Sequence, residues 1–138
     1  MHDRYDVMVA IQAAWSSATT ESPDAWSASN PAKGQCDVSS LVAMEHLGGD
    51  IVQGEVHLNG DFQEYHYWNR INGVDLDLTR SQFRRGEVIT ETGVLAGETV
   101  LRRQGQMRAE LRDRLTLFRE SVAEHLATMA PAFVPLAA

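Results

Sequence analysis

The sequence has a single cysteine, Cys36, and no apolar run near the length of a membrane-spanning helix. One cysteine excludes an internal disulfide, and a spanning helix needs about 20 consecutive apolar residues. The first 15 residues carry acidic side chains and lack the apolar stretch of a secretory signal peptide. We therefore expect a cytoplasmic protein that does not partner with a membrane.

Positive charge is also scarce. The chain has 12 Lys and Arg residues against 19 Asp and Glu residues, so its net charge at pH 7 is −7. The arginines are scattered, whereas nucleic-acid binding needs a concentrated positive surface, so nucleic acid is not an expected partner. No CxxC, HxH or HExxH spacing occurs, and no metal or other cofactor is expected.

The chain does contain enough apolar sequence for a substantial core, since 43% of its 138 residues are hydrophobic. No internal repeat or low-complexity tract divides it, so we expect one domain over residues 1–138.

Three segments have the apolar spacing of helices. The N-terminal helix is predicted along a stripe of Tyr5, Met8, Ile11 and Trp15, and a long polar loop containing Trp26 follows it. The second helix runs from Cys36 to Leu47, is apolar around much of its circumference, and ends at Gly48-Gly49. A C-terminal surface helix is predicted from an apolar stripe that comprises Met107, Leu111, Leu115, Phe118, Val122 and Leu126.

Between the second and third helices the apolar pattern alternates, as it does in strands. Residues 50–58, 62–71 and 74–79 are separated by Asn59-Gly60 and Asn72-Gly73, which are strong hairpin-turn signals. The fold class is therefore predicted as α+β, with the cysteine-bearing helix packed on a three-stranded antiparallel meander. Residues 86–105 contain four glycines and are ambiguous between a short strand or turn and a mobile lid that determines specificity.

Cys36 is predicted in the first turn of its helix. There the positive end of the helix dipole favours the thiolate, which is the form that attacks carbonyl carbons. A lone cysteine is more often a buried structural residue, so helix position alone does not make Cys36 a nucleophile.

The Asn72-Gly73 turn supplies a further argument, because it sets the register of the second hairpin. It places Trp68 opposite Asp77 and puts His66 and Asp77 diagonally on one face, about 7–8 Å apart between their backbones. The carboxylate can then hold one imidazole nitrogen and leave the other for a thiol. Zinc bound by Cys36, His66 and Asp77 is an alternative, but no zinc-binding spacing supports it.

Two further pairings are predicted around His66. Pairing through the Asn59-Gly60 turn places Gln53 opposite His66. Asp75 lies on the same face as His66 but opposite Arg70, which favours an ion pair between these two side chains.

Three motifs carry a family resemblance: NPAKGQC at residues 30–36, HYWN at 66–69 and DLTRSQF at 77–83. In this order they resemble the YunG family of small bacterial proteins, over about residues 10–83. More distantly, a cysteine at a helix start, H-x-W on a strand and D-x-T on the next is similar to the papain-like and transglutaminase-like superfamily. This resemblance implies a catalytic triad of Cys36, His66 and Asp77. It also implies acyl transfer through an acyl-thioester: hydrolysis or transfer of an amide, peptide or thioester.

Such a mechanism also needs donors for the tetrahedral oxyanion. The backbone N–H of Cys36 is one candidate, because first-turn amides have no helical partner. The second is the side-chain amide of Gln35 or of Asn30, which lies six residues before the cysteine, where papain-like enzymes carry their oxyanion glutamine. Trp68 lies on the His66 face and could shield the site from water.

The expected partner is a small-molecule or peptide acyl donor, and the oligomeric state is left open. Two other function classes remain: a non-catalytic binding module on the same fold, and a thiol redox sensor. Within the enzyme hypothesis, a biosynthetic cyclase or acyltransferase acting on a thioester-bound chain is also open.

Overall fold

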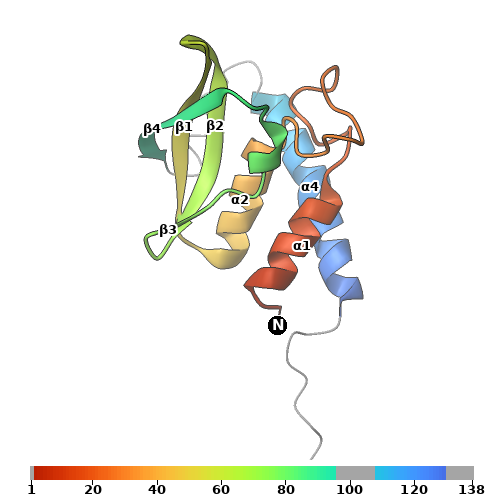
Figure 1. Cartoon of the computed structure of the whole chain (residues 1–138). Coiled ribbons are helices and arrows are strands. Elements are labelled where there is room, and N and C mark those ends of the chain that lie inside the picture. The colour runs from red at the N-terminus through yellow and green to blue at the C-terminus, as the bar shows by residue number, and fades with distance from the viewer. Residues whose placement is uncertain (1, 96–107, 130–138) are drawn as a thin grey trace, which may run out of the picture.

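A central helix separates a β-sheet from two outer helices in the computed structural model, which describes residues 2–95 and 108–129 (Figure 1). Helix α2 (Cys36–Leu47) contacts the sheet on one side and the helices α1 (Arg4–Ala14) and α4 (Arg108–Thr128) on the other. The outer helices also pack against each other. The predicted α+β class is thus confirmed, with the cysteine-bearing helix as the middle layer.

Helix α2 has the predicted bounds. It begins at Cys36 and ends where Gly48 takes a φ of 76° and donates its backbone N–H to the carbonyl of Met44 at 2.9 Å. Glycine reaches this φ without the steric cost that a Cβ adds. Burial is continuous from Cys36 to Ala43, because other elements surround the first two turns of the helix.

Helix α1 is present, and its buried face matches the predicted stripe in part. Tyr5 is 71% exposed, and the buried residues are Val7, Ala10, Ile11 and Ala14. Small side chains let helices approach closely, so the alanines rather than the larger Tyr5 face α2 and α4. Of the predicted stripe, Ile11 is fully buried, and Met8 and Trp15 are partly buried against the core.

The loop between α1 and α2 is folded onto itself and onto α2. Trp15, at the end of α1, is half-buried and donates its Nε1–H to Ser39 Oγ at 2.9 Å. Trp26 is also half-buried, and its Nε1–H bonds to the carbonyl of Pro31 within the same loop. Trp26 therefore braces this loop.

The sheet contains the predicted meander and one more strand. Its order is β3-β2-β1-β4, and every neighbouring pair is antiparallel. The additional strand corrects the prediction of a lid, because residues 87–95 pair with β1 at the sheet edge; residues 96–105 lie outside the described residues. The four strands are β1 (Asp50–Leu58), β2 (Asp61–Ile71), β3 (Val74–Leu76) and β4 (Glu87–Leu95).

The two hairpins differ in how well their register was predicted. Around Asn72-Gly73 the pairing is as expected, with Arg70 opposite Asp75. In the first hairpin a bulge after Val56 shifts the ladder by one residue, so Gly54 rather than Gln53 lies opposite His66. A bulge inserts an unpaired residue, which alternation in the sequence does not reveal.

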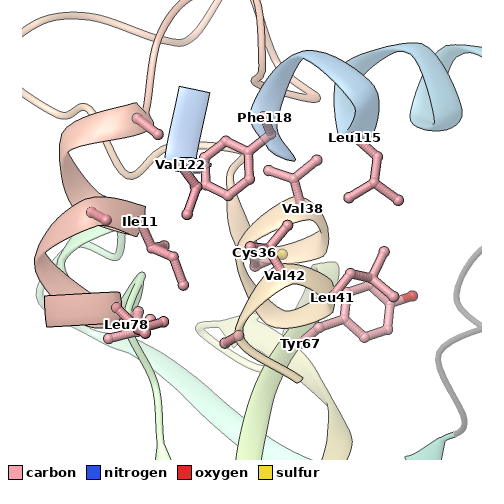
Figure 2. Packing of buried hydrophobic residues seen from close by; sticks show 14 of the residues in the cluster. Ile11, Cys36, Val38, Leu41, Val42, Tyr67, Leu78, Leu115, Phe118 and Val122 are labelled. Atoms are coloured by element: carbon pink, nitrogen blue, oxygen red, sulfur yellow. The ribbon is translucent and has the colours of Figure 1, made fainter. Parts of the chain in front are cut away.

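The main core lies between the sheet and the helices, and Figure 2 shows side chains from α1, α2, α4 and β2 meeting there. Leu78, just after β3, also points into this core. The predicted stripe of α4 is buried from Leu111 to Leu126, while Met107 lies outside the described residues. Within residues 2–95 and 108–129, no helix is both long and apolar enough to cross a membrane.

Candidate active site

His66 and Asp77 are in direct contact, as predicted. The imidazole Nε2 lies 2.7 Å from Asp77 Oδ2, and the His66 side chain is fully buried. Asp77 reaches it after the chain has left the ladder at Leu76 and turned to bury Leu78. The contact is confirmed, although the regular strand pairing that predicted it ends one residue earlier.

Two aromatic rings enclose the imidazole. The Trp68 ring stacks on His66 with centroids 5.5 Å apart, and the Phe83 ring meets it edge-on at 4.7 Å. Gly54 provides the space for this packing, because a Cβ there would lie 2.8 Å from two Trp68 ring atoms. Trp68 therefore occupies the position beside His66 that the sequence predicted.

Ion pairs on the surface of the sheet hold the Trp68 side chain in place. The predicted pair forms, with Arg70 Nε 2.6 Å from Asp75 Oδ1, and Arg70 also reaches Glu91 on β4. The other oxygen of Asp75 accepts the Trp68 Nε1–H at 3.1 Å. The Arg70 guanidinium lowers the pKa of Asp75, which keeps this acceptor charged.

Two buried atoms of the His66–Asp77 pair have no hydrogen-bond partner among the described residues: His66 Nδ1 and Asp77 Oδ1. A carboxylate only accepts, so this contact needs a proton on Nε2, and in the neutral imidazole the lone pair is then on Nδ1. Buried polar atoms are normally satisfied, and an unpaired one calls for an explanation. A free imidazole lone pair is what a general base requires.

Cys36 lies at the first position of α2, only 6% exposed and within the main core (Figure 2). The backbone N–H of Tyr67 donates to its sulfur. Burial raises the pKa of the thiol well above its ordinary value, and the carboxylate of Asp37 raises it further. The predicted lowering of the pKa by the helix dipole is therefore wrong, because loss of solvation outweighs it.

The structure brings Cys36 close to the chain of β2 without joining it to the imidazole. Its sulfur bonds to Tyr67, the neighbour of His66 in the sequence. Tyr67 and Asn69 face α2, so strand alternation turns the His66 side chain to the other face. Since Nδ1 has no partner in the described part of the chain, the thiol–imidazole hydrogen bond is not formed.

The two amides predicted to stabilise an oxyanion both hold loops together. Gln35 is fully buried; its Oε1 accepts from Thr19 Oγ1 and its Nε2 donates to the carbonyl of Ser16, each at 2.9 Å. Asn30 donates its Nδ2–H to the carbonyl of Gln82 at 3.2 Å. Gln35 directly precedes Cys36, and its Nε2 has a second hydrogen that this bond to Ser16 does not use.

A buried ion pair next to Cys36 was missed by the sequence reasoning. Asp37 is fully buried, and Arg114 of α4 donates to both of its oxygens, at 2.7 and 3.1 Å, and to the carbonyl of Thr19. The position of Arg114 in the sequence was a signal for this pair. Arg114 directly precedes Leu115 and lies three residues after Leu111, so it borders the apolar stripe of the helix. A charged residue there needs a buried partner.

A surface depression of about 350 Å³ lies between the loop after α1 and the start of α4. Its walls include Glu21, Asp113 and Arg114, and burial raises the pKa of Glu21. Neither Cys36 nor His66 is among its lining residues. Among residues 2–95 and 108–129, no group of three or more His, Cys, Asp or Glu side chains is placed to hold a metal, so the zinc alternative gains no support there.

Comparison with known proteins places the chain in a family. A curated relative, the uncharacterized protein YunG of Bacillus subtilis (strain 168), is 35% identical over 74 residues, which are 54% of this chain and 57% of the relative. The chain thus matches little more than half the length of that relative. No solved structure matches the chain. The profile of the family described as YunG protein matches residues 3–127, and the chain therefore belongs to the YunG family.

Proposed function

We propose that this protein is a cysteine-dependent acyl-transfer enzyme in which Cys36 is the nucleophile, His66 the base and Asp77 the residue that orients the base. The observation that carries the proposal is the His66–Asp77 contact, which leaves Nδ1 buried and without a partner among the described residues. The Cys-His-Asp order and the carboxylate on Nε2 are similar to the papain-like and transglutaminase-like superfamily.

The state of the thiol decides how the base must act. Because burial and Asp37 raise its pKa, Cys36 rests as the neutral thiol. His66 Nδ1 then removes the proton as the sulfur attacks the acyl carbon, in the manner of a serine–histidine pair. The new S–C bond gives a tetrahedral oxyanion. When it collapses, the bond to the leaving group breaks and the imidazolium donates its proton to that group.

The step requires the sulfur to leave the Tyr67 N–H and, because the His66 side chain points to the other face of β2, a rearrangement that brings the sulfur within hydrogen-bonding reach of Nδ1. The backbone N–H of Cys36 and the unused amide hydrogen of Gln35 are the oxyanion donors in this scheme. The substrate class is a small-molecule or peptide acyl donor. Water, an amine or another group of the same substrate molecule can accept the acyl group. Hydrolysis, transfer and cyclisation share these residues.

One observation favours a second function, a non-catalytic binding module. Cys36 is a core residue with a raised thiol pKa, which is also typical of a structural cysteine. The same observation disfavours the redox sensor, because peroxide reacts with exposed thiolates. A covalent adduct that depends on His66 separates the enzyme from the module.

The test is intact-mass spectrometry after incubation with acyl thioesters, activated esters and glutamine peptides. We expect the wild-type protein to gain one acyl mass from at least one donor class, and Cys36→Ser to gain none. His66→Ala should slow acylation at least about 100-fold, the usual contribution of a general base. His46→Ala is the matched control, because this exposed histidine lies at the other end of α2.

Acylation that is equally fast in H66A and H46A would show that the imidazole is not the base. Failure of every donor class to acylate the wild type would favour the binding module.

A further inference from the structure

The segment Asp77–Phe83 touches both halves of the candidate site. Its first residue bonds to the His66 imidazole, and its last residue places a ring against the same imidazole. Between them, the short helix η1 (Arg80–Gln82) carries a buried glutamine, Gln82, that reaches the loop before Cys36.

Gln82 is 4% exposed and makes four hydrogen bonds, one of them from its backbone N–H to the carbonyl of Thr79 at 3.0 Å. Its Oε1 accepts the backbone N–H of Gly34 at 3.2 Å, and its Nε2 donates to Thr79 Oγ1 at 3.0 Å. Its backbone carbonyl accepts from Asn30. The side chain therefore joins a residue two positions before the cysteine to a residue two positions after Asp77.

The loop at Gly34 has little freedom to move independently. Gly34 has a φ of 72°, and a Cβ there would lie 2.2 Å from Thr20 Oγ1. Thr20 itself donates to the carbonyl of Lys33 at 2.6 Å. This rigid turn directly precedes α2. A hydrogen bond to Gly34 therefore also fixes the position of the start of α2, where Cys36 lies.

We propose that Gln82 is a positioning residue that sets the distance between the Cys36 sulfur and the His66 imidazole; this rests on the proposed function. Cys36 belongs to α2 and His66 to β2. The Gln82 side chain links the turn before Cys36 to the segment Asp77–Phe83, which holds the His66 imidazole. Losing both side-chain hydrogen bonds lets the turn shift against that segment. Displacement of a reacting group by about 1 Å can cost 100-fold in rate.

The experiment measures alkylation of Cys36 by iodoacetamide between pH 6 and pH 9, with intact mass as the readout. Gln82→Met keeps the volume of the side chain and removes its hydrogen bonds. Gln53→Met is the matched control, because Gln53 is 7% exposed and its Nε2 bonds to Thr92 on the β1–β4 side of the sheet. Circular dichroism of each variant verifies that it is folded.

We expect Q82M to slow alkylation at pH 7.5 about tenfold or more and to move the pH profile toward that of H66A. Q53M should stay within about threefold of the wild type. Added to H66A, Q82M should have little further effect, because Gln82 acts through the imidazole. Gln82→Glu should restore much of the rate, since a carboxylate accepts from both the Gly34 N–H and the Thr79 hydroxyl.

The outcomes separate the two proposals. If H66A leaves the alkylation rate unchanged, the proposed function fails. If H66A slows alkylation but Q82M resembles Q53M, or slows it equally with and without H66A, the positioning role is overturned and the proposed function stands. A Q82M protein that does not fold shifts the decision to Q82E, whose rate must then exceed that of H66A.

Discussion

At the scale of single residues, Cys36 shows how burial outweighs helix position. A charge near the N-terminus of a helix gains about 0.3–1 kcal/mol from the dipole. Removing a charge from water costs several kcal/mol, even after the protein relaxes. Cys36 lies in the core beside the Asp37 carboxylate, so the neutral thiol is the stable form.

This raised pKa predicts a specific dependence of stability on pH. The unfolded thiol ionises near pH 8.5 while the folded one stays neutral, so the thiol's contribution is complete below about pH 8.5 and is lost as the pH rises. The loss is about 1.4 kcal/mol for each pH unit between the two pKa values. Urea unfolding under reducing conditions should show that the wild type loses more of its free energy of unfolding than Cys36→Ala does between pH 7.5 and pH 10.

The comparison between the two proteins controls for tyrosines and lysines, which titrate in the same range in both. Equal losses in the wild type and in C36A would mean that the folded and unfolded thiols have the same pKa.

At the scale of elements, two arginines of α4 hold that helix to α2 in different surroundings. Arg114 pairs with the fully buried Asp37. Arg119 pairs with Glu45, and both of these side chains are more than a third exposed. Water screens an exposed pair, whereas a buried carboxylate that loses its partner keeps its full desolvation cost.

Substituting each arginine by methionine should therefore have unequal effects. Arg114→Met leaves Asp37 buried without its cation, and we expect a loss of about 3–5 kcal/mol in the free energy of unfolding. Arg119→Met should cost about 1 kcal/mol or less. Urea denaturation at pH 7.5 measures both, and R114M within 1 kcal/mol of R119M would show that water reaches Asp37.

The elements also show what could be predicted from the sequence. The helix Cys36–Leu47 and the Asn72-Gly73 hairpin carry local signals, a glycine stop and a two-residue turn. The bounds of the helix and the register at the turn were predicted correctly, whereas the third strand ends at Leu76 and not, as predicted, at Thr79. The bulge after Val56 and the buried face of α1 depend on packing partners far along the chain. Alternation and helical spacing do not contain that information.

In the candidate site, too, the contacts that follow from local sequence signals were predicted and those that depend on distant residues were not. The His66–Asp77 contact follows from a hairpin turn, and it was predicted. The Gln82 bond to Gly34 joins residues 48 positions apart, and no local pattern marks it. The raised pKa of Cys36 depends on its burial by several elements, which the sequence of one helix does not specify.

At the scale of the whole molecule, the sheet is buried on both faces near the site. Ile51 and Tyr67 belong to the main core beneath α2. Val52, Val56 and His66 are equally buried but point to the opposite face. The site therefore lies where β2 contributes alternate side chains to two apolar layers, and its geometry depends on the integrity of the main core.

That dependence predicts a single cooperative transition. Phe118 of α4 is fully buried between α1 and α2 (Figure 2), and Phe118→Ala should cost about 3–5 kcal/mol and lower Tm by roughly 10–15 °C. Far-UV circular dichroism, which follows the helices, and tryptophan fluorescence, which includes Trp68 beside His66, should shift together. Leu117→Ala is the control, because this neighbour is 49% exposed and should change Tm by only a few degrees. If F118A lowered the dichroism midpoint and left the fluorescence midpoint in place, the helices and the sheet would be separate folding units, and the core would not support the site.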